Sequence, residues 1–492
     1  MQIEVIAKPA ESADVSVVFA GEGKKLLGLG AALGKTLQKA LAAPSFSAKR
    51  GEIVDVLGSP TARRILVVGV GNPKELSAIR ARKIGGKIAA HLMQAREPKA
   101  QILGGGNLGK LEEAVFLGNV ALGARLRSYR FGKYVTQAKP GEGPAEIATL
   151  SLATSERTAT QKIVADAEAL AAGICYARDQ VNEPPSTLYP DAFARRLSEL
   201  KKHGIAIEVY DEGALRKMGA GGILAVAQGS QHPPRLVVLR WNGKGGKSKG
   251  GPVALVGKGV CFDSGGLSLK RTSQMLTMKG DMGGAAAVAG AILTAALRKA
   301  KVDVVGVMAL VENMPSGSSY RPGDIVKTLA GKTMEIIDTD AEGRVTLVDS
   351  LYYAASKCNP SCILDAATLT YSVSAALGPV YAGLFATEEA LAREALAAGE
   401  AAGEELWRLP VTADYLKNLK SKVADYRQVA PDDVSADAAH AAALMSEFVA
   451  GKPWAHLDIA NKEFAGRDTA ICPEGATGYG VALFDAFLRQ RE

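Results

Sequence analysis

The chain has 492 residues, which is enough for two or three domains with sizeable buried cores. Apolar residues make up 47% and charged residues 22%, a globular balance that excludes a disordered or fibrous chain. The five cysteines form no CxxC pair, so we expect neither a disulfide framework nor a cysteine-bound zinc. We expect the protein to reside in a reducing compartment. The N-terminus shows no signal-peptide pattern. We therefore expect a cytoplasmic protein.

The net charge of +8 is unevenly distributed. Residues 1–150 hold 22 Lys and Arg against 12 Asp and Glu, a surplus of ten, whereas residues 151–492 are close to neutral. Such a basic region can attract polyanions, DNA among them, and the alternative is an ordinary solvated basic face.

Apolar runs and helical stretches alternate along the first third. Strands are predicted over 3–7, 15–20, 65–70 and 147–153, and 74–97 has the composition of a helix. A Pro/Gly-rich connector is predicted at 139–145. A long helix follows over about 160–179, and we expect it to bridge two domains.

The rest of the chain alternates in the same way. Strands are predicted at 235–241, 252–257, 302–311 and 361–364. The uncharged stretch from Met282 to Leu297 is too short and too rich in Ala and Gly for a membrane span, so we expect a buried helix there and no membrane association. This order predicts a mixed, mainly parallel sheet, in which ligand sites gather at the carboxyl ends of the strands.

Two segments carry the chemistry. In the first, an apolar run delivers Lys258 and Asp263, two glycines follow, and Lys270 and Asp281 come next. In the second, Asp340 and Glu342 are two residues apart, which places them on one face of an extended segment, with Arg344 on the same face if the segment stays extended.

Four carboxylates brought together repel one another unless cations compensate them. Their oxygen-rich ligation suits Mg²⁺, Mn²⁺ or a two-metal hydrolytic centre with ions about 3.5–4 Å apart. Each acid taken alone is better explained as a helix cap or a surface residue. The whole set beside two lysines and an arginine favours a site.

At this point the sequence resembles the leucyl (cytosol) aminopeptidase family. That family's signature, NTDAEGRL, reads DTDAEGRV at 338–345. Further matching segments run from VNEPP at 181–185 to GATGYG at 475–480, so the resemblance covers roughly 165–492. It implies a smaller N-terminal α/β domain (1–160), a bridging helix (161–180) and a larger catalytic domain (181–492) around a mixed, mainly parallel sheet flanked by helices.

Position by position, the resemblance implies roles for the charged residues. Five residues would ligate two divalent ions, Mn²⁺ or Zn²⁺: Lys258, Asp263, Asp281, Asp340 and Glu342. A lysine ligand must be a neutral amine, so Lys258 needs a lowered pKa, which burial beside two cations supplies. Lys270 and Arg344 would be the catalytic pair, the lysine polarising the tetrahedral intermediate and the arginine holding a bicarbonate that acts as general base.

The resemblance also implies a pocket for the first side chain of the peptide. Met278 and the segment containing Thr368 and Leu369 would line it. Relatives continue this segment with Gly, but Tyr371 stands here. If Tyr371 fills the pocket, small first residues such as Ala are favoured; if it swings to the rim, Leu and Met stay accepted. We expect a preference altered from the Leu-type preference of the family.

The predicted protein is therefore an aminopeptidase that releases N-terminal residues from peptides, and the resemblance implies a homohexamer. Two alternatives stay open. One is a DNA-binding regulatory or architectural protein that uses the basic first third. The other is a catalytically dead relative, against which the intact constellation argues.

Overall fold

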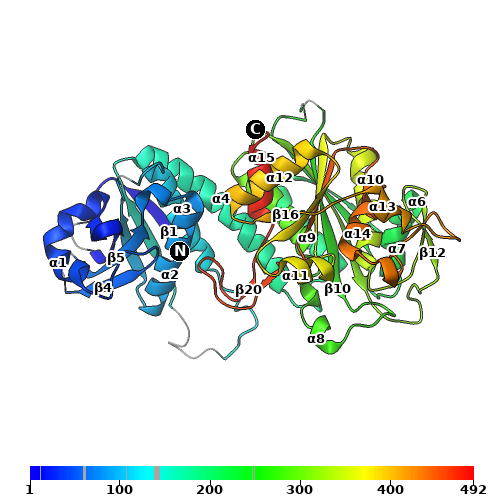
Figure 1. Ribbon diagram of the computed structural model, residues 1–492, viewed down its shortest axis with the longest axis horizontal. Helices are drawn as coiled ribbons and strands as arrows, with labels where there is room; N and C mark the ends of the chain where they lie inside the picture. The colour runs from blue at the N-terminus through cyan, green and yellow to red at the C-terminus, as the bar shows by residue number, and fades with distance from the viewer. Residues whose placement is uncertain (11–12, 59–61, 107, 138–144, 247, 249) are drawn as a thin grey trace. The chain divides into compact units, whose positions relative to one another are not determined.

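The computed structural model describes residues 1–492 apart from 11–12, 59–61, 107, 138–144, 247 and 249. The chain forms two compact units (Figure 1). Unit 1 comprises Met1–Ala171 and Ala465–Gly475, and unit 2 comprises Ala172–Phe464 and Ala476–Glu492. The long helix predicted over 160–179 is confirmed as α4 (Arg157–Asn182), and the division falls inside it. The predicted connector at 139–145 lies almost wholly outside the described residues.

Unit 1 is built on a sheet with the strand order β1-β7-β6-β2-β5-β4, and β3 pairs with β2. The neighbouring strands in the series β1-β7-β6-β2-β5 are parallel to one another, and β4 is antiparallel to β5. The strands are β1 (Gln2–Ile6), β2 (Ala13–Gly21), β3 (Lys25–Leu26), β4 (Ile53–Leu57), β5 (Ala62–Gly71), β6 (Lys99–Leu103) and β7 (Thr149–Ala153).

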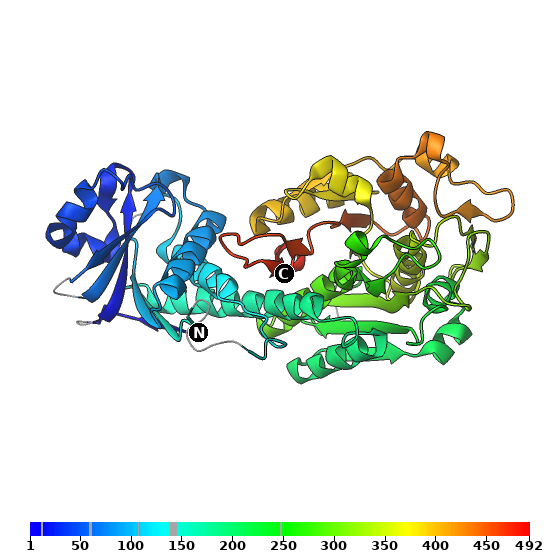
Figure 2. The same ribbon diagram turned by 90° about the horizontal axis from the view of Figure 1, so that it is seen from below.

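Helices pack on both faces of this sheet because its central strands are apolar on both sides. Val17 and Phe19 of β2 belong to the core under α2 (Ala78–Gln94) and α3 (Glu113–Arg127). Val18, between them, faces the opposite way, toward α1 (Gly34–Ala42). Figure 2 shows this unit from below, with the helices on either side of the strands.

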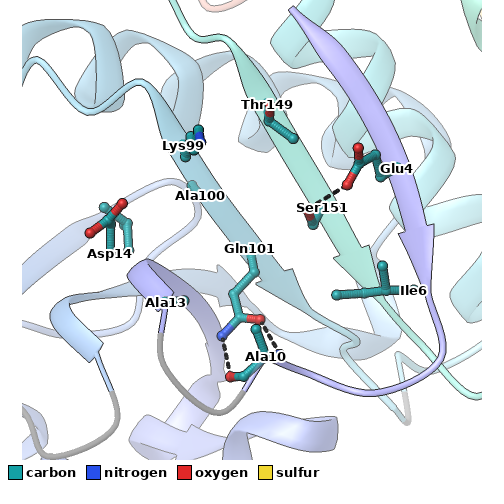
Figure 3. Close-up of a pocket in the computed structure, with 11 residues that line it drawn as sticks. Glu4, Ile6, Ala10, Ala13, Asp14, Lys99, Ala100, Gln101, Thr149 and Ser151 are labelled. Atoms are coloured by element: carbon teal, nitrogen blue, oxygen red, sulfur yellow. Dashed lines mark hydrogen bonds between the residues drawn. The ribbon is translucent and has the colours of Figure 1, made fainter.

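The face of β1, β7 and β6 opposite α2 and α3 carries polar side chains around a hollow of about 360 Å³ (Figure 3). Gln101 donates to Oγ of Ser16 at 2.9 Å and accepts from the Ala10 amide at 2.9 Å. Ser151 donates to Glu4. Within the described residues, the polar groups of Gln101 and Ser151 are thus hydrogen-bonded to protein partners.

Unit 2 is built on an eight-stranded sheet with the order β16-β15-β18-β14-β10-β11-β9-β8. Its centre, β18-β14-β10-β11, is parallel, and antiparallel strands flank it, as the mixed sheet predicted from the sequence requires. The strands are β8 (Ala206–Tyr210), β9 (Arg235–Asn242), β10 (Val253–Asp263), β11 (Asp303–Asn313), β14 (Cys362–Ala367), β15 (Ala382–Ala386), β16 (Leu406–Arg408) and β18 (Trp454–Asp458).

Two helices sandwich the centre of this sheet. Helix α9 (Gly283–Leu297) lies so close to β10 that a methyl group on Gly257 would come within 2.6 Å of Cα of Ala285. Helices α10 (Glu342–Lys357) and α7 (Gly221–Ala227) cover the other face. The stretch Thr272–Leu297 has the length and hydropathy of a membrane span, but 94% of its apolar window is buried in the protein. It is therefore a core segment, as predicted.

The remaining elements surround this sandwich. They are α5 (Pro190–Ser198), α6 (Glu212–Met218), α8 (Thr272–Met275), the short 3₁₀ helix η5 (Met278–Gly280), α11 (Tyr371–Leu377), α12 (Glu389–Ala402), α13 (Ala413–Lys417), α14 (Asp437–Ser446), α15 (Val481–Arg489), β12 (Ile325–Lys327), β13 (Thr333–Glu335), β17 (Tyr426–Arg427), β19 (Phe464–Ala465) and β20 (Gly475–Ala476).

Candidate metal centre and active site

The carboxyl end of β10 positions the first acidic residue. Asp263 is the last residue of the strand, and the chain then turns through Gly265 and Gly266, both with positive φ (+88° and +64°) that L side chains rarely adopt. Oδ1 of Asp263 accepts the Gly265 amide at 2.8 Å and Nδ2 of Asn313 at 2.8 Å. Two donors on one oxygen fix the carboxylate at the strand end.

The segment around Asp340 and Glu342 is a turn, so the predicted extended segment is wrong. Residues 338–341 form no strand, and Glu342 begins helix α10, where a carboxylate interacts favourably with the positive end of the helix dipole. The turn still brings the acids together. Ligand oxygens of Asp263, Asp340 and Glu342 all lie within 4.8 Å of one another.

Lys258 connects the remaining acid to this group. Its buried Nζ lies 2.8 Å from Oδ1 of Asp281 and 2.8 Å from Oε1 of Glu342, and it donates to the carbonyl of Thr368 at 2.8 Å. Oδ2 of Asp281 is buried with no hydrogen-bond partner among the described residues. An orphaned carboxylate oxygen close to the acids Glu342 and Asp263 is a ligand atom that a bound cation would satisfy.

Lys270 neutralises the open side of the cluster. Its Nζ lies 2.9 Å from Oδ2 of Asp263 and also pairs with Asp340. The two lysines thus hold four carboxylates together. Four ionised carboxylates against two ammonium groups give the cluster a formal charge of −2.

The pKa values reflect that imbalance. Burial, reinforced by neighbouring acids, raises the pKa of Asp281 and of Glu342, and it raises the pKa of Asp340 to about 7. For Lys258, burial lowers the pKa, but the carboxylates of Asp281 and Glu342 together raise it by more than burial lowers it, so the net shift is upward. Without cations the pKa of Lys258 is therefore raised, and the lowered value expected for a lysine ligand requires cations in place.

Arg344 lies in the first turn of α10 and is buried. Its Nη2 lies 2.7 Å from Oδ1 of Asp437, and Nη1 donates to the Gln428 carbonyl at 3.2 Å. Its Nε is buried and has no partner among the described residues. A guanidinium nitrogen in that state is suited to an anion.

The four residues predicted to line the substrate pocket differ in their surroundings. Met278 begins η5, and Thr368, just after β14, donates to Oδ1 of Asp281 at 2.7 Å. Leu369 is half-buried, and its Cδ1 would meet a methyl group on Gly343 at 2.8 Å. Tyr371 begins α11 and is 84% exposed, so its ring does not fill interior space.

Sequence reasoning missed two residues that hold the site in place. Asn313 anchors Asp263, and Asp437 pairs with Arg344. Asn313 carried a signal, because it ends a long buried strand parallel to β10. Asp437 carried none, because it lies 93 residues from its partner in an Ala-rich helix.

The architecture and the site together define a class of protein, a two-domain α/β protein with a cluster of acidic side chains at the carboxyl end of its central sheet that could hold divalent cations. Residues 175–484 match the profile of the cytosol aminopeptidase family, catalytic domain, and residues 17–138 match that family's N-terminal domain. The chain belongs to the cytosol aminopeptidase family. It is an aminopeptidase and a metallo-exopeptidase.

Relatives of nearly the same length support this assignment. A probable cytosol aminopeptidase of Rhodopseudomonas palustris (strain BisA53) is 42% identical over 96% of this chain and 94% of its own, and one of Methylorubrum extorquens is 41% identical over 99% and 98%. The solved structure of the bottromycin maturation enzyme BotP in complex with Mn has a TM-score of 0.84 at 36% identity, covering 97% of this chain and 99% of BotP. None of these comparisons supports the DNA-binding alternative.

Proposed function

We propose that this chain removes the first residue of peptides at a centre of two divalent cations, Mn²⁺ or Zn²⁺, held by the acidic cluster. The observation that carries this proposal is the convergence of Asp263, Asp340 and Glu342 within 4.8 Å, with the orphaned oxygen of Asp281 beside them. The ligands would be Lys258, Asp263, Asp281, Asp340 and Glu342. Two such cations supply Lewis acidity for the scissile carbonyl and lower the pKa of a water molecule.

The side chains around the cluster perform the remaining work. Lys270, released from its pairing with the acids, donates a hydrogen bond to the carbonyl oxygen as negative charge develops there, an effect worth roughly 3–4 kcal/mol. Arg344 would hold a bicarbonate, which is a proton acceptor, through its Nε, which has no partner among the described residues. Met278, Thr368 and Leu369 would border the first side chain of the peptide.

The assembly and the location of the enzyme are proposals of the same kind. The near full-length match to cytosol aminopeptidases supports a cytoplasmic enzyme. The family resemblance supports a homohexamer, for which sedimentation of the purified protein gives the test. A monomer at micromolar concentration would contradict it.

The test of the catalytic proposal is reconstitution. Chelator-treated protein is expected to hydrolyse leucyl-anilide only after a divalent metal is added back, with Zn²⁺, Mn²⁺ and Mg²⁺ each tested alone. It should never act on the N-acetylated substrate, which lacks a free amine.

Asp340→Ala and Glu342→Ala each remove a carboxylate from the cluster, so turnover and bound metal should both be lost. Glu400→Gln, an exposed position on α12, is the control and should keep both. Full activity in Asp340→Ala, or in metal-free protein, contradicts the proposal.

A further inference from the structure

A fifth carboxylate, that of Glu463, borders the candidate site without a role in it. It follows β18 by five residues, at the point where the chain leaves the sheet. Its Oε2 is buried and makes no hydrogen bond among the described residues. Burial raises the pKa of this carboxyl, while backbone amides and the nearby charge of Lys258 lower it less strongly.

Two glycines fix the place of Glu463. A methyl group on Gly280 would lie 3.0 Å from Cγ of Glu463, and one on Gly283 would lie 3.5 Å from its Cβ and 3.7 Å from Cγ2 of Thr368. Gly280 closes the short helix that Met278 begins, and Thr368 bonds Asp281. Glu463 therefore packs beside the residues that we propose to border the first side chain of the substrate.

Three lysines in the surrounding segments direct their hydrogen bonds to groups other than this carboxylate. Lys258 is bound by Asp281, Glu342 and a backbone carbonyl. Lys462 donates to the carbonyl of Gly378, and Lys279 donates to that of Asn182 at 2.8 Å. A buried carboxylate without a paired cation is costly, and a cation supplied by a ligand would offset that cost.

We propose that Glu463 selects peptides whose first residue has a cationic side chain, lysine or arginine, by pairing its carboxylate with that side chain. The inference rests on the proposed aminopeptidase function and names the substrate class of the same site. A pocket that holds a buried partner for a polar group rejects the analogue lacking that group far more strongly than an apolar pocket rejects a missing methylene. Lysyl peptides should therefore be strongly preferred over norleucyl peptides, whose side chain has the same carbons without the ammonium.

The test compares kcat/KM for lysyl- and norleucyl-anilides in the wild type, in Glu463→Gln and in the control Glu400→Gln. The wild type and the control are expected to prefer the lysyl substrate by at least about tenfold. Glu463→Gln should lose that preference, with the loss confined to the lysyl substrate. An unchanged ratio overturns the inference. So does an equal loss on both substrates, because it would mean that Glu463 binds the α-amine common to all peptides or only supports the fold.

Binding of free amino acids gives a readout that does not depend on turnover. Calorimetric titration should show that L-lysine binds the wild type more tightly than L-norleucine and that Glu463→Gln abolishes the difference. If the wild type hydrolyses neither anilide with any metal, the proposed function fails while this titration still decides the role of Glu463. Thermal unfolding of Glu463→Gln checks that the variant is folded; equal binding of both amino acids by the folded wild type overturns the inference.

Discussion

Tyr371 begins helix α11 and is 84% exposed, with Thr370 as the N-cap. Of the two outcomes that its size allowed, the structure favours the one in which the ring leaves the pocket open. We expect Tyr371→Ala to leave the ranking of Ala-, Leu-, Met- and Phe-anilides unchanged within about threefold. Leu369→Ala, which empties a half-buried position beside Gly343, should alter it. A changed ranking in Tyr371→Ala would show that the Tyr371 side chain does line the pocket.

At the same scale, the motifs predicted which charged residues lie close together but not the backbone conformation that brings them together. The pair Asp340 and Glu342 after an apolar run is compatible with a strand, whereas in the structure Glu342 begins helix α10, which packs on the sheet. The roles of these residues stay predictions until the variants are measured. Glu463 shows the limit most clearly, because none of its neighbours along the chain indicates that one oxygen of its carboxylate is buried without a hydrogen-bond partner among the described residues.

At the scale of elements, buried Asp349 ties helix α10 to its neighbours. It accepts the Ile223 amide of α7 at 3.0 Å and the Leu329 amide at 2.7 Å. Burial raises the pKa of Asp349 to about 7, against the lowering effect of these amides. The unfolded value is about 4, so between these pH values the folded state keeps a proton that the unfolded chain has released. The stability that Asp349 contributes is therefore complete below about pH 4 and is lost as the pH rises through about 7.

Urea unfolding at pH 5 and pH 7.5 measures this effect. The difference in unfolding free energy, wild type minus Asp349→Asn, should be larger at pH 5 than at pH 7.5, because the variant has no carboxyl at position 349 to titrate. Asp433→Asn, at an exposed position, should show no such change relative to the wild type. A difference between the wild type and Asp349→Asn that is the same at both pH values contradicts the prediction.

The sequence predicted most of the central elements because their apolar runs are long and local. It could not predict how closely they approach. A methyl group on Gly284 would lie 2.0 Å from the Ala366 carbonyl, so α9 contacts the strand layer directly there and brings Asp281, just before the helix, to Lys258. A glycine in a small-residue helix gives no sign of which partner it meets.

At the scale of the whole molecule, the two-unit organisation was foreseen but not the return of the chain to unit 1 over Ala465–Gly475. Asp468 pairs with Arg127, and a methyl group on Gly86 would meet the Ala470 carbonyl at 1.9 Å. These contacts join segments more than 300 residues apart, and no local pattern encodes them. The sequence-based division therefore placed 465–475 with the catalytic domain.

The division into units makes metal binding a local event. All the proposed ligands lie in unit 2, so cations should stabilise that unit by mass action, by about 2.7 kcal/mol when free metal is at 100 times its dissociation constant. Hydrogen exchange followed by mass spectrometry, with and without Mn²⁺, should show slower exchange in peptides covering 258–281 and 338–346. Peptides from β2 and β5 of unit 1 should be unaffected, because exchange reports the opening of separate cooperative regions. In Asp340→Ala the added protection should disappear. Equal slowing in both units, or slowing that survives in Asp340→Ala, would show that Mn²⁺ acts elsewhere than at the acidic cluster.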